Sequence, residues 1–196
     1  MFETKDTVYF SEAGAVNTEK ALETAVQTAV KESVQAIVVA TSTGETAFKL
    51  KDTADRLGYG GKLIAVRYHE GFHKPNEHMM NEENLTKLHS MGFDVHTGTH
   101  ALSSITRSFR IKWQGIGVPE IVAETLRLFG RGLKTCVEVA VMAADGGRIP
   151  DIHEDVIAIA GTSKGADTAL LLRAAYQNTF IQDMKIRRII CKPEVF

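Results

Sequence analysis

Two short apolar runs in this sequence each end directly in a turn of small hydroxyl residues and glycine. The first run, Ala36–Val39, leads into the turn Ala40–Ala47, and the second, Val156–Ile159, leads into the turn Gly161–Ala169. A continuously apolar run with β-branched residues is typical of a strand in a parallel sheet that helices cover on both faces. The two runs therefore favour an α/β fold.

The rest of the chain alternates between strand-like and helix-like segments, without a long linker or a low-complexity stretch. Such alternation predicts a single three-layer α/β domain over residues 1–196, with a mostly parallel sheet and right-handed crossovers. The expected strands are Thr7–Phe10, Gln35–Ala40, Lys62–Arg67, Phe93–Thr97, Asp155–Ala160, Ala169–Arg173 and Ile186–Cys191. The expected helices are Asn17–Glu32, Gly44–Leu57, Glu82–Met91, Ser103–Lys112, Pro119–Phe129, Leu133–Asp145 and Asn178–Met184.

The order of the strands decides where the two turns lie. We expect the strands at Phe93, Lys62, Gln35 and Asp155 to be neighbours in that order. The strand at Ala169 should run antiparallel to the strand before it, because the connection is too short for a parallel crossover. In a doubly wound sheet, ligands bind beyond the carboxyl ends of strands where the winding direction reverses. Both turns would then open into one crevice.

Hydroxyl residues, glycine and one lysine give both turns the character of a phosphate site. Backbone N–H groups at the end of a strand bind anions, and glycine lets a phosphate approach closely. Neither turn is a Walker loop or a G-x-G-x-x-G loop. An ordinary helix N-cap and a solvated hairpin lysine are the competing interpretations. The candidate ligand-binding residues are Thr41, Ser42, Thr43, Gly44, Glu45 and Thr46 in the first turn, and Thr162, Ser163, Lys164 and Gly165 in the second.

Within the first turn, Glu45 would repel a phosphate unless its side chain points outward or pairs with a base. Further candidates follow the other strands. Arg67, with Tyr68 beside it, ends the second central strand and could contact a ring. The segment Gly98, Thr99, His100 and Ala101 follows the third central strand and should face the same crevice. His100 is the one candidate for catalysis, as a proton donor or hydrogen-bond partner, and a structural loop histidine is the alternative.

Other reactive residue types are expected to have structural roles. His69, His73 and His78 lie in a segment that glycine and proline interrupt, which excludes the helical spacing of metal ligands, so we expect no metal site. Glu138 is a lone acid in an almost wholly apolar helix and should make a structural hydrogen bond. Cys136 has no base near it in the sequence and should serve packing.

Composition narrows the functional classes. The 196 residues include 23 basic and 24 acidic ones, so the charge balance does not favour nucleic acid as a partner. The apolar runs are too short to span a bilayer, and Met1–Lys5 lacks the basic start and apolar stretch of a signal peptide. Cys136 and Cys191 lie far apart and form no CxxC pair, which favours free thiols in a reducing cytoplasm.

Several segments together resemble a known domain. The first turn, the strand after it and the segment Ala158–Arg173 are similar to parts of the C-terminal, regulatory domain of pyruvate kinase. In that domain, the corresponding loops hold a sugar bisphosphate. The chain more closely resembles a stand-alone, mostly archaeal and bacterial family of pyruvate kinase C-terminal-like proteins. The segments that carry this resemblance are Ala40–Ala47, Gly98–Ser104, Cys136–Asp145, Ala158–Arg173 and Ile190–Pro193.

The resemblance implies a three-layer α/β fold like that of the pyruvate kinase C-terminal domain. It also implies flavin mononucleotide (FMN) as the cofactor, because the stand-alone family is associated with FMN, and His100 would then face the flavin ring. Pyruvate kinase activity is not expected, because the chain has no barrel to supply the phosphoenolpyruvate site.

The expected function is therefore binding of FMN as a phosphorylated small molecule, with oxidoreductase activity as one use of it. A non-catalytic sensor module for a sugar phosphate or nucleotide is the alternative, and a phosphate-ester enzyme that uses His100 is a third hypothesis. The expected partners are the small-molecule ligand and a second copy in a homo-oligomer. Nucleic acid and membrane are not expected partners.

Overall fold

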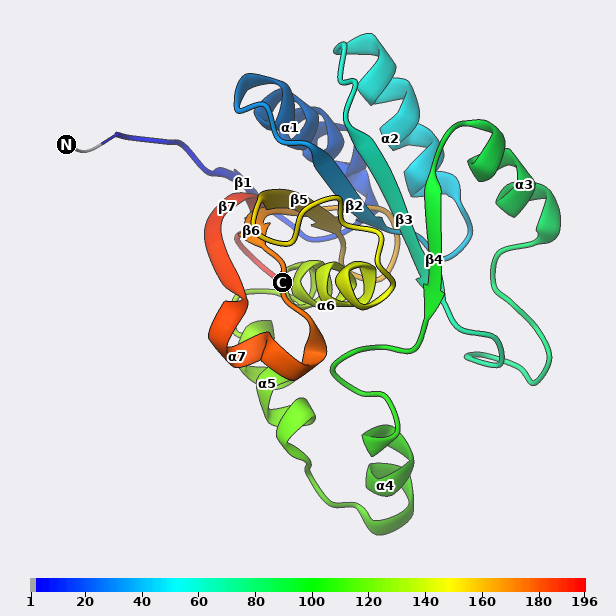
Figure 1. Ribbon diagram of the computed structural model, residues 1–196. Helices are drawn as coiled ribbons and strands as arrows, with labels where there is room; N and C mark the ends of the chain where they lie inside the picture. Colours follow the sequence, from blue (N-terminus) through cyan, green and yellow to red (C-terminus); the bar gives the residue numbers. More distant parts are fainter. Residues whose placement is uncertain (1–2) are drawn as a thin grey trace.

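The computed structural model describes residues 3–196, so Met1 and Phe2, which open the N-terminal stretch Met1–Lys5, lie outside the described residues. Within residues 3–196, seven strands form one sheet in the order β1-β7-β6-β5-β2-β3-β4 (Figure 1). The strands are β1 (Val8–Phe10), β2 (Ala36–Ala40), β3 (Lys62–Tyr68), β4 (Asp94–Gly98), β5 (Asp155–Ala160), β6 (Thr168–Arg173) and β7 (Lys185–Pro193).

The helices confirm the expected alternation, with ends that differ from the expected ones by up to three residues. The segment expected as one short helix at Asn178–Met184 is a 3₁₀ turn, Gln177–Thr179, followed by α7. Another 3₁₀ turn, Ala15–Asn17, precedes α1. The helices are α1 (Thr18–Lys31), α2 (Glu45–Arg56), α3 (Glu82–Ser90), α4 (Thr106–Trp113), α5 (Val118–Arg127), α6 (Arg131–Asp145) and α7 (Phe180–Asp183).

The pairing of the central strands confirms the expected topology. The strands β4, β3, β2 and β5 are parallel neighbours in that order. Strand β6 runs antiparallel to β5, with Ala160 opposite Thr168. The residues 161–167 that join β5 and β6 are too few for a parallel crossover, so the chain turns back on itself.

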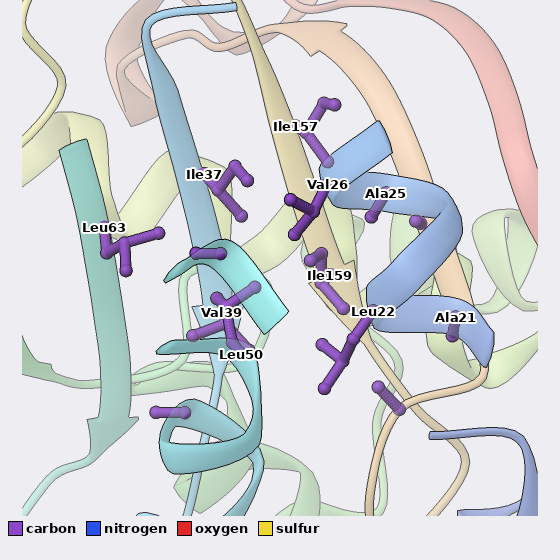
Figure 2. Close-up of a cluster of buried hydrophobic side chains, with 14 of the residues drawn as sticks. Ala21, Leu22, Ala25, Val26, Ile37, Val39, Leu50, Leu63, Ile157 and Ile159 are labelled. Atoms are coloured by element: carbon purple, nitrogen blue, oxygen red, sulfur yellow. The ribbon is translucent and has the colours of Figure 1, made fainter. Parts of the chain in front are cut away.

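The side chains of β2 show why the molecule has three layers. Ile37 and Val39 pack into a cluster with α1 and α2 on one face of the sheet (Figure 2), whereas Ala36 and Val38 pack against α6 on the other face. Successive side chains of a strand point to opposite faces, so a continuously apolar strand needs cover on both. Figure 1 shows α1, α2 and α3 on one face and α6 on the other.

Helix α6 is apolar nearly all round and is buried as expected, including Cys136. Burial raises the pKa of the Cys136 thiol and raises that of Cys191 to about 12, so both thiols stay protonated at neutral pH. Both cysteines are free. No helix among residues 3–196 combines the length and the hydropathy that a membrane span requires.

Candidate functional site

The carboxyl ends of β2, β3 and β5 border a crevice of about 1030 Å³, which we call the crevice from here on. Strand β2 lies between β3 and β5, and the chain leaves β2 toward β3 on one side and reaches β5 on the other. The crevice therefore lies at the reversal of winding. Both hydroxyl-rich turns, the end of β3 and one face of α6 contribute residues to its lining.

The first turn, Thr41–Thr46, leads into α2, and side-chain hydrogen bonds hold its conformation. The Thr41 hydroxyl accepts a hydrogen bond from the Gly44 N–H at 3.1 Å, and the Asn84 side chain donates to the Thr43 carbonyl at 2.8 Å. Gly44 has a φ of +105°, which favours glycine. The N–H groups of Glu45 and Thr46 belong to the first turn of α2 and have no carbonyl in the helix to bond. The Glu45 side chain is exposed.

In the structure, the second turn covers residues 161–167, between β5 and β6, and its backbone N–H groups bond to other parts of the protein. The buried Asp167 carboxylate accepts hydrogen bonds from the Thr162 N–H at 3.0 Å and the Gly14 N–H at 2.9 Å. The Ala166 N–H donates to the Thr18 hydroxyl at 3.1 Å. These donors hold the β5–β6 connection in shape and are not available to a ligand. What this turn offers the crevice is the exposed Lys164 side chain, with Ser163 and Gly165 beside it.

Three stacked rings form one wall of the crevice. The rings of Tyr68, at the end of β3, and Phe72 lie 4.2 Å apart and nearly parallel. The His100 imidazole stacks on both, with centroid distances of 5.0 Å to Tyr68 and 5.2 Å to Phe72. Next to them, the Arg67 Nε donates to the Thr97 hydroxyl at 2.6 Å. Flat rings of this kind cover a flat apolar ligand.

Helix α6 brings a buried charged group to His100. The Glu138 Oε2 lies 2.9 Å from the His100 Nδ1 and also accepts a hydrogen bond from Lys134, while the Glu138 Oε1 accepts from the Leu102 N–H at 3.0 Å. Burial alone would raise the pKa of Glu138, but the hydrogen bond from His100 and the charge of Lys134 outweigh burial and lower the pKa to about 2. Glu138 is thus a carboxylate at every ordinary pH.

Charge in the crevice favours an anion. Its carboxylates are those of Glu45, Glu124 and Glu138, and the last is neutralised by Lys134. Two buried polar atoms at the crevice, the Arg67 Nη1 and the His100 Nε2, have no hydrogen-bond partner among the described residues. Buried polar atoms without a partner are uncommon and indicate a missing acceptor or donor. The cationic side chains of the lining are Lys49, Arg67, Arg127, Arg131, Lys134 and Lys164.

The structure separates the candidate residues into two groups. Those that line the crevice are Thr41, Ser42, Thr43, Glu45, Thr46, Arg67, His100, Ser163, Lys164 and Gly165. Those that do not contribute to the lining are Gly44, Gly98, Thr99, Ala101 and Thr162. Gly44 and Thr162 shape their turns, and Ala101 packs into the core beneath α6.

Sequence reasoning missed most of the lining that α5 and α6 supply. Lys134 and Thr135 follow Arg131 after three and four residues, and Glu138 and Met142 follow Lys134 in steps of four, so these five residues share one face of α6. That spacing was visible in the sequence, but nothing local shows that this face borders a crevice. Glu138 was expected to make a structural hydrogen bond, and its bond to His100 also places it beside the crevice.

The histidines of the β3–α3 loop do not converge on a metal site. Among residues 3–196, no three His, Cys, Asp or Glu side chains lie close enough together to hold a metal ion. His73 lines the crevice and packs against the Tyr68 and Phe72 rings. The His78 Nε2 instead lies 3.6 Å from the Glu70 Oε2.

Fold and site together define the class: a three-layer α/β domain with a cationic crevice at the carboxyl edge of a mostly parallel sheet. No family model matches the sequence. Among solved structures, the chain is similar to Cryptosporidium parvum pyruvate kinase in complex with ADP, at 17% sequence identity and a TM-score of 0.39. The match covers 81% of this chain and 24% of that chain, so this chain spans about a quarter of the length of the pyruvate kinase.

Proposed function

We propose that this chain binds a phosphorylated small molecule in the crevice, and that FMN is the ligand that the crevice fits best. The observation that carries the proposal is that two unlike groups of residues line one crevice of about 1030 Å³. One group is a helix N-terminus with hydroxyl groups and cations, and the other is a set of stacked rings. FMN has the matching parts, a phosphate and a flat ring. Cofactor pockets typically have volumes of about 300–1,000 Å³.

The phosphate is expected at the first turn, where Thr43 and Ser42 line the crevice and the first N–H groups of α2 point out of the helix end. The helix dipole favours negative charge at this place. Lys49 and Lys164 are the nearby cations of the lining that can neutralise the phosphate. The exposed position of Glu45 lets its carboxylate face water instead of the phosphate.

The flavin ring is expected over the Tyr68 and Phe72 rings, with the edge of the His100 imidazole facing the edge of the flavin. The residues around these rings therefore fit the group: they offer aromatic cover, the unpartnered Arg67 Nη1 and the unpartnered His100 Nε2. When bound, FMN would supply one- or two-electron redox chemistry. This chain would bind and orient the cofactor and exclude water from one side of the ring.

A comparison of FMN with riboflavin tests the proposal, because riboflavin has the ring without the phosphate. We expect FMN to bind the purified chain at least about 30-fold more tightly than riboflavin, since each charge-assisted hydrogen bond contributes about 1.5–3 kcal/mol. Quenching of flavin fluorescence measures both affinities.

Three outcomes decide between ligands. Equal affinity for the two flavins would exclude the first turn as a phosphate site. Failure to bind either flavin, with binding of a sugar phosphate or a nucleotide, would replace FMN by the ligand of a sensor module. Failure to bind any of these would overturn the proposed function.

A further inference from the structure

The protonation of the His100 ring follows from its partner. A carboxylate has only acceptors, so the Glu138 Oε2 at 2.9 Å requires a proton on the His100 Nδ1. Glu138 also accepts from Lys134 and from the Leu102 N–H, which fixes its orientation. In a neutral imidazole whose Nδ1 carries the proton, the Nε2 holds a lone pair and accepts hydrogen bonds.

The other ring nitrogen of His100, Nε2, is buried and unused by the protein. The His100 Nε2 has no hydrogen-bond partner among the described residues, although His100 lines the crevice. The Tyr68 and Phe72 rings stack on the imidazole and hold its plane. Leaving a buried acceptor unsatisfied costs about 1–3 kcal/mol, so a ligand with an N–H or O–H group at this position gains affinity.

We propose that His100 is a neutral imidazole whose Nε2 accepts a hydrogen bond from the N3–H group of the flavin ring, and that Glu138 and Lys134 are the positioning residues for it. The proposal rests on the proposed function, since N3–H is the ring N–H donor that oxidised flavin offers. It orients the pyrimidine edge of the ring toward the end of β4 and the dimethylbenzene edge away from it. From the sequence, His100 was expected as a proton donor or as a hydrogen-bond partner, and this proposal gives it the second role, as an acceptor.

Methylation of the flavin N3 tests this hydrogen bond directly. In the wild-type chain, N3-methyl-FMN should bind about tenfold more weakly than FMN, because the methyl group removes the donor and leaves the Nε2 unsatisfied. In His100→Ala, FMN itself should bind more weakly, and methylation should change its affinity less than about twofold. An equal methylation penalty in the two proteins would overturn the inference and leave FMN binding intact.

A second measurement needs no ligand and no variant. Nitrogen chemical shifts of the His100 ring in the free protein report which ring nitrogen carries a proton, and the proposal requires a protonated Nδ1 and an unprotonated Nε2. In Glu138→Gln this tautomer preference should weaken. A protonated Nε2 in the wild-type chain would overturn the inference. Failure of wild-type protein to bind either flavin would instead count against the proposed function.

An independent observation concerns the segment of residues 105–129, which we call the α4–α5 arm. Helix α4 buries none of its residues, and Figure 1 shows it apart from the sheet. A hydrogen bond from the Thr106 hydroxyl to Glu120 joins α4 to α5. Nine large apolar residues of the arm are each more than half exposed: Ile105, Phe109, Ile111, Trp113, Ile116, Val118, Ile121, Leu128 and Phe129.

The geometry points to a second copy of this chain as the partner that covers the arm. The exposed apolar area of these nine side chains is roughly 1,000 Å² in each copy, and a stable interface needs about 800 Å² from each partner. A two-fold axis would place the same arm of both copies in one interface, so each copy would cover the exposed apolar residues of the other.

Trp113 is the single tryptophan of the chain and reports on this interface. The wild-type chain should sediment with twice the mass of one chain, and dilution should shift the Trp113 emission to longer wavelength as the indole meets water. Phe109→Glu should abolish the dimer, because Phe109 packs beside Trp113 on the same face of α4, whereas Val16→Glu, at an exposed apolar residue outside the arm, should leave it intact. A wild-type monomer at every concentration, or a dimeric Phe109→Glu variant, would overturn the inference.

Discussion

Replacing Glu138 by alanine should lower the free energy of unfolding by about 3–5 kcal/mol, because it leaves a buried cation without its partner. The side chain of Glu138 is 1% exposed and that of Lys134 is 8% exposed. Lys134 would lose the carboxylate that neutralises it, and the Leu102 N–H would lose its acceptor. Guanidinium unfolding at pH 7 measures the loss. A loss below about 1 kcal/mol would contradict a buried, functional ion pair.

Two controls separate the charge from the volume of the side chain. The double variant Lys134→Met with Glu138→Leu removes both charges and keeps apolar volume, so it should lose less than half as much stability as Glu138→Ala. Glu124→Ala removes a glutamate whose side chain is 65% exposed and should change stability by less than about 0.5 kcal/mol.

Acid unfolding measures the contribution of Glu138 to the stability of the fold in a second way. The folded pKa of Glu138 is about 2, below its ordinary value of 4.5. A carboxylate with a lowered folded pKa stabilises the fold at pH values above its unfolded pKa, and this stabilisation is lost as the pH falls toward the folded pKa. The wild-type chain should therefore lose stability between about pH 4.5 and pH 2, and Glu138→Ala should lose less over that interval.

Replacing Thr43 by aspartate should weaken FMN binding about 30-fold and leave riboflavin binding unchanged. Thr43 lines the crevice immediately before α2, so a carboxylate there repels the phosphate at close range. The same charge stabilises the helix N-terminus, which keeps the fold intact. Parallel titrations of the variant with FMN and riboflavin measure the effect.

Thr43→Asn is the matched control, because it has nearly the size of aspartate without the charge. It should retain FMN affinity within about threefold, since the backbone N–H donors of the turn are unchanged. If Thr43→Asp and wild-type protein bind FMN equally, the phosphate does not lie at this turn. Thermal unfolding of both variants shows whether the turn itself is intact.

The glycine beside Thr43 cannot serve this test, although the sequence suggested it. From the sequence, Thr43→Val together with Gly44→Val was expected to block the phosphate with little loss of stability. Gly44 has a φ of +105°, and a Cβ there would lie 3.0 Å from the Phe48 ring. Valine is strained in that backbone region, so the double variant would also damage the start of α2.

The strand order illustrates how far local sequence reasoning extends. Apolar runs, turn residues and one short connection predicted parallel neighbours β4, β3, β2 and β5 and an antiparallel β6, and the sheet has this order. Each of these features acts within a few residues of the chain, and the rules for connecting strands leave few alternatives. Local sequence features alone therefore predict that the two turns, at the ends of β2 and β5, lie on one edge of the sheet.

The roles of individual residues in the two turns could not be predicted from the sequence. The turns look alike in sequence, yet the N–H of Thr162 is taken by the Asp167 carboxylate, and the Ala166 N–H is taken by Thr18. Thr18 is separated from Ala166 by 148 residues. No local pattern reveals such a partner, because which donors remain free depends on what the fold brings next to them.

The sequence by itself determined the layered α/β architecture and the sheet edge at which both hydroxyl-rich turns lie, because strand periodicity, turn chemistry and short connections are local properties. Only the tertiary structure decided that His100 meets Glu138 and that one face of α6 completes the crevice. These two residues are 38 positions apart. Their contact, and with it the position of the His100 proton, arises from packing α6 under the sheet, where a buried carboxylate must find donors.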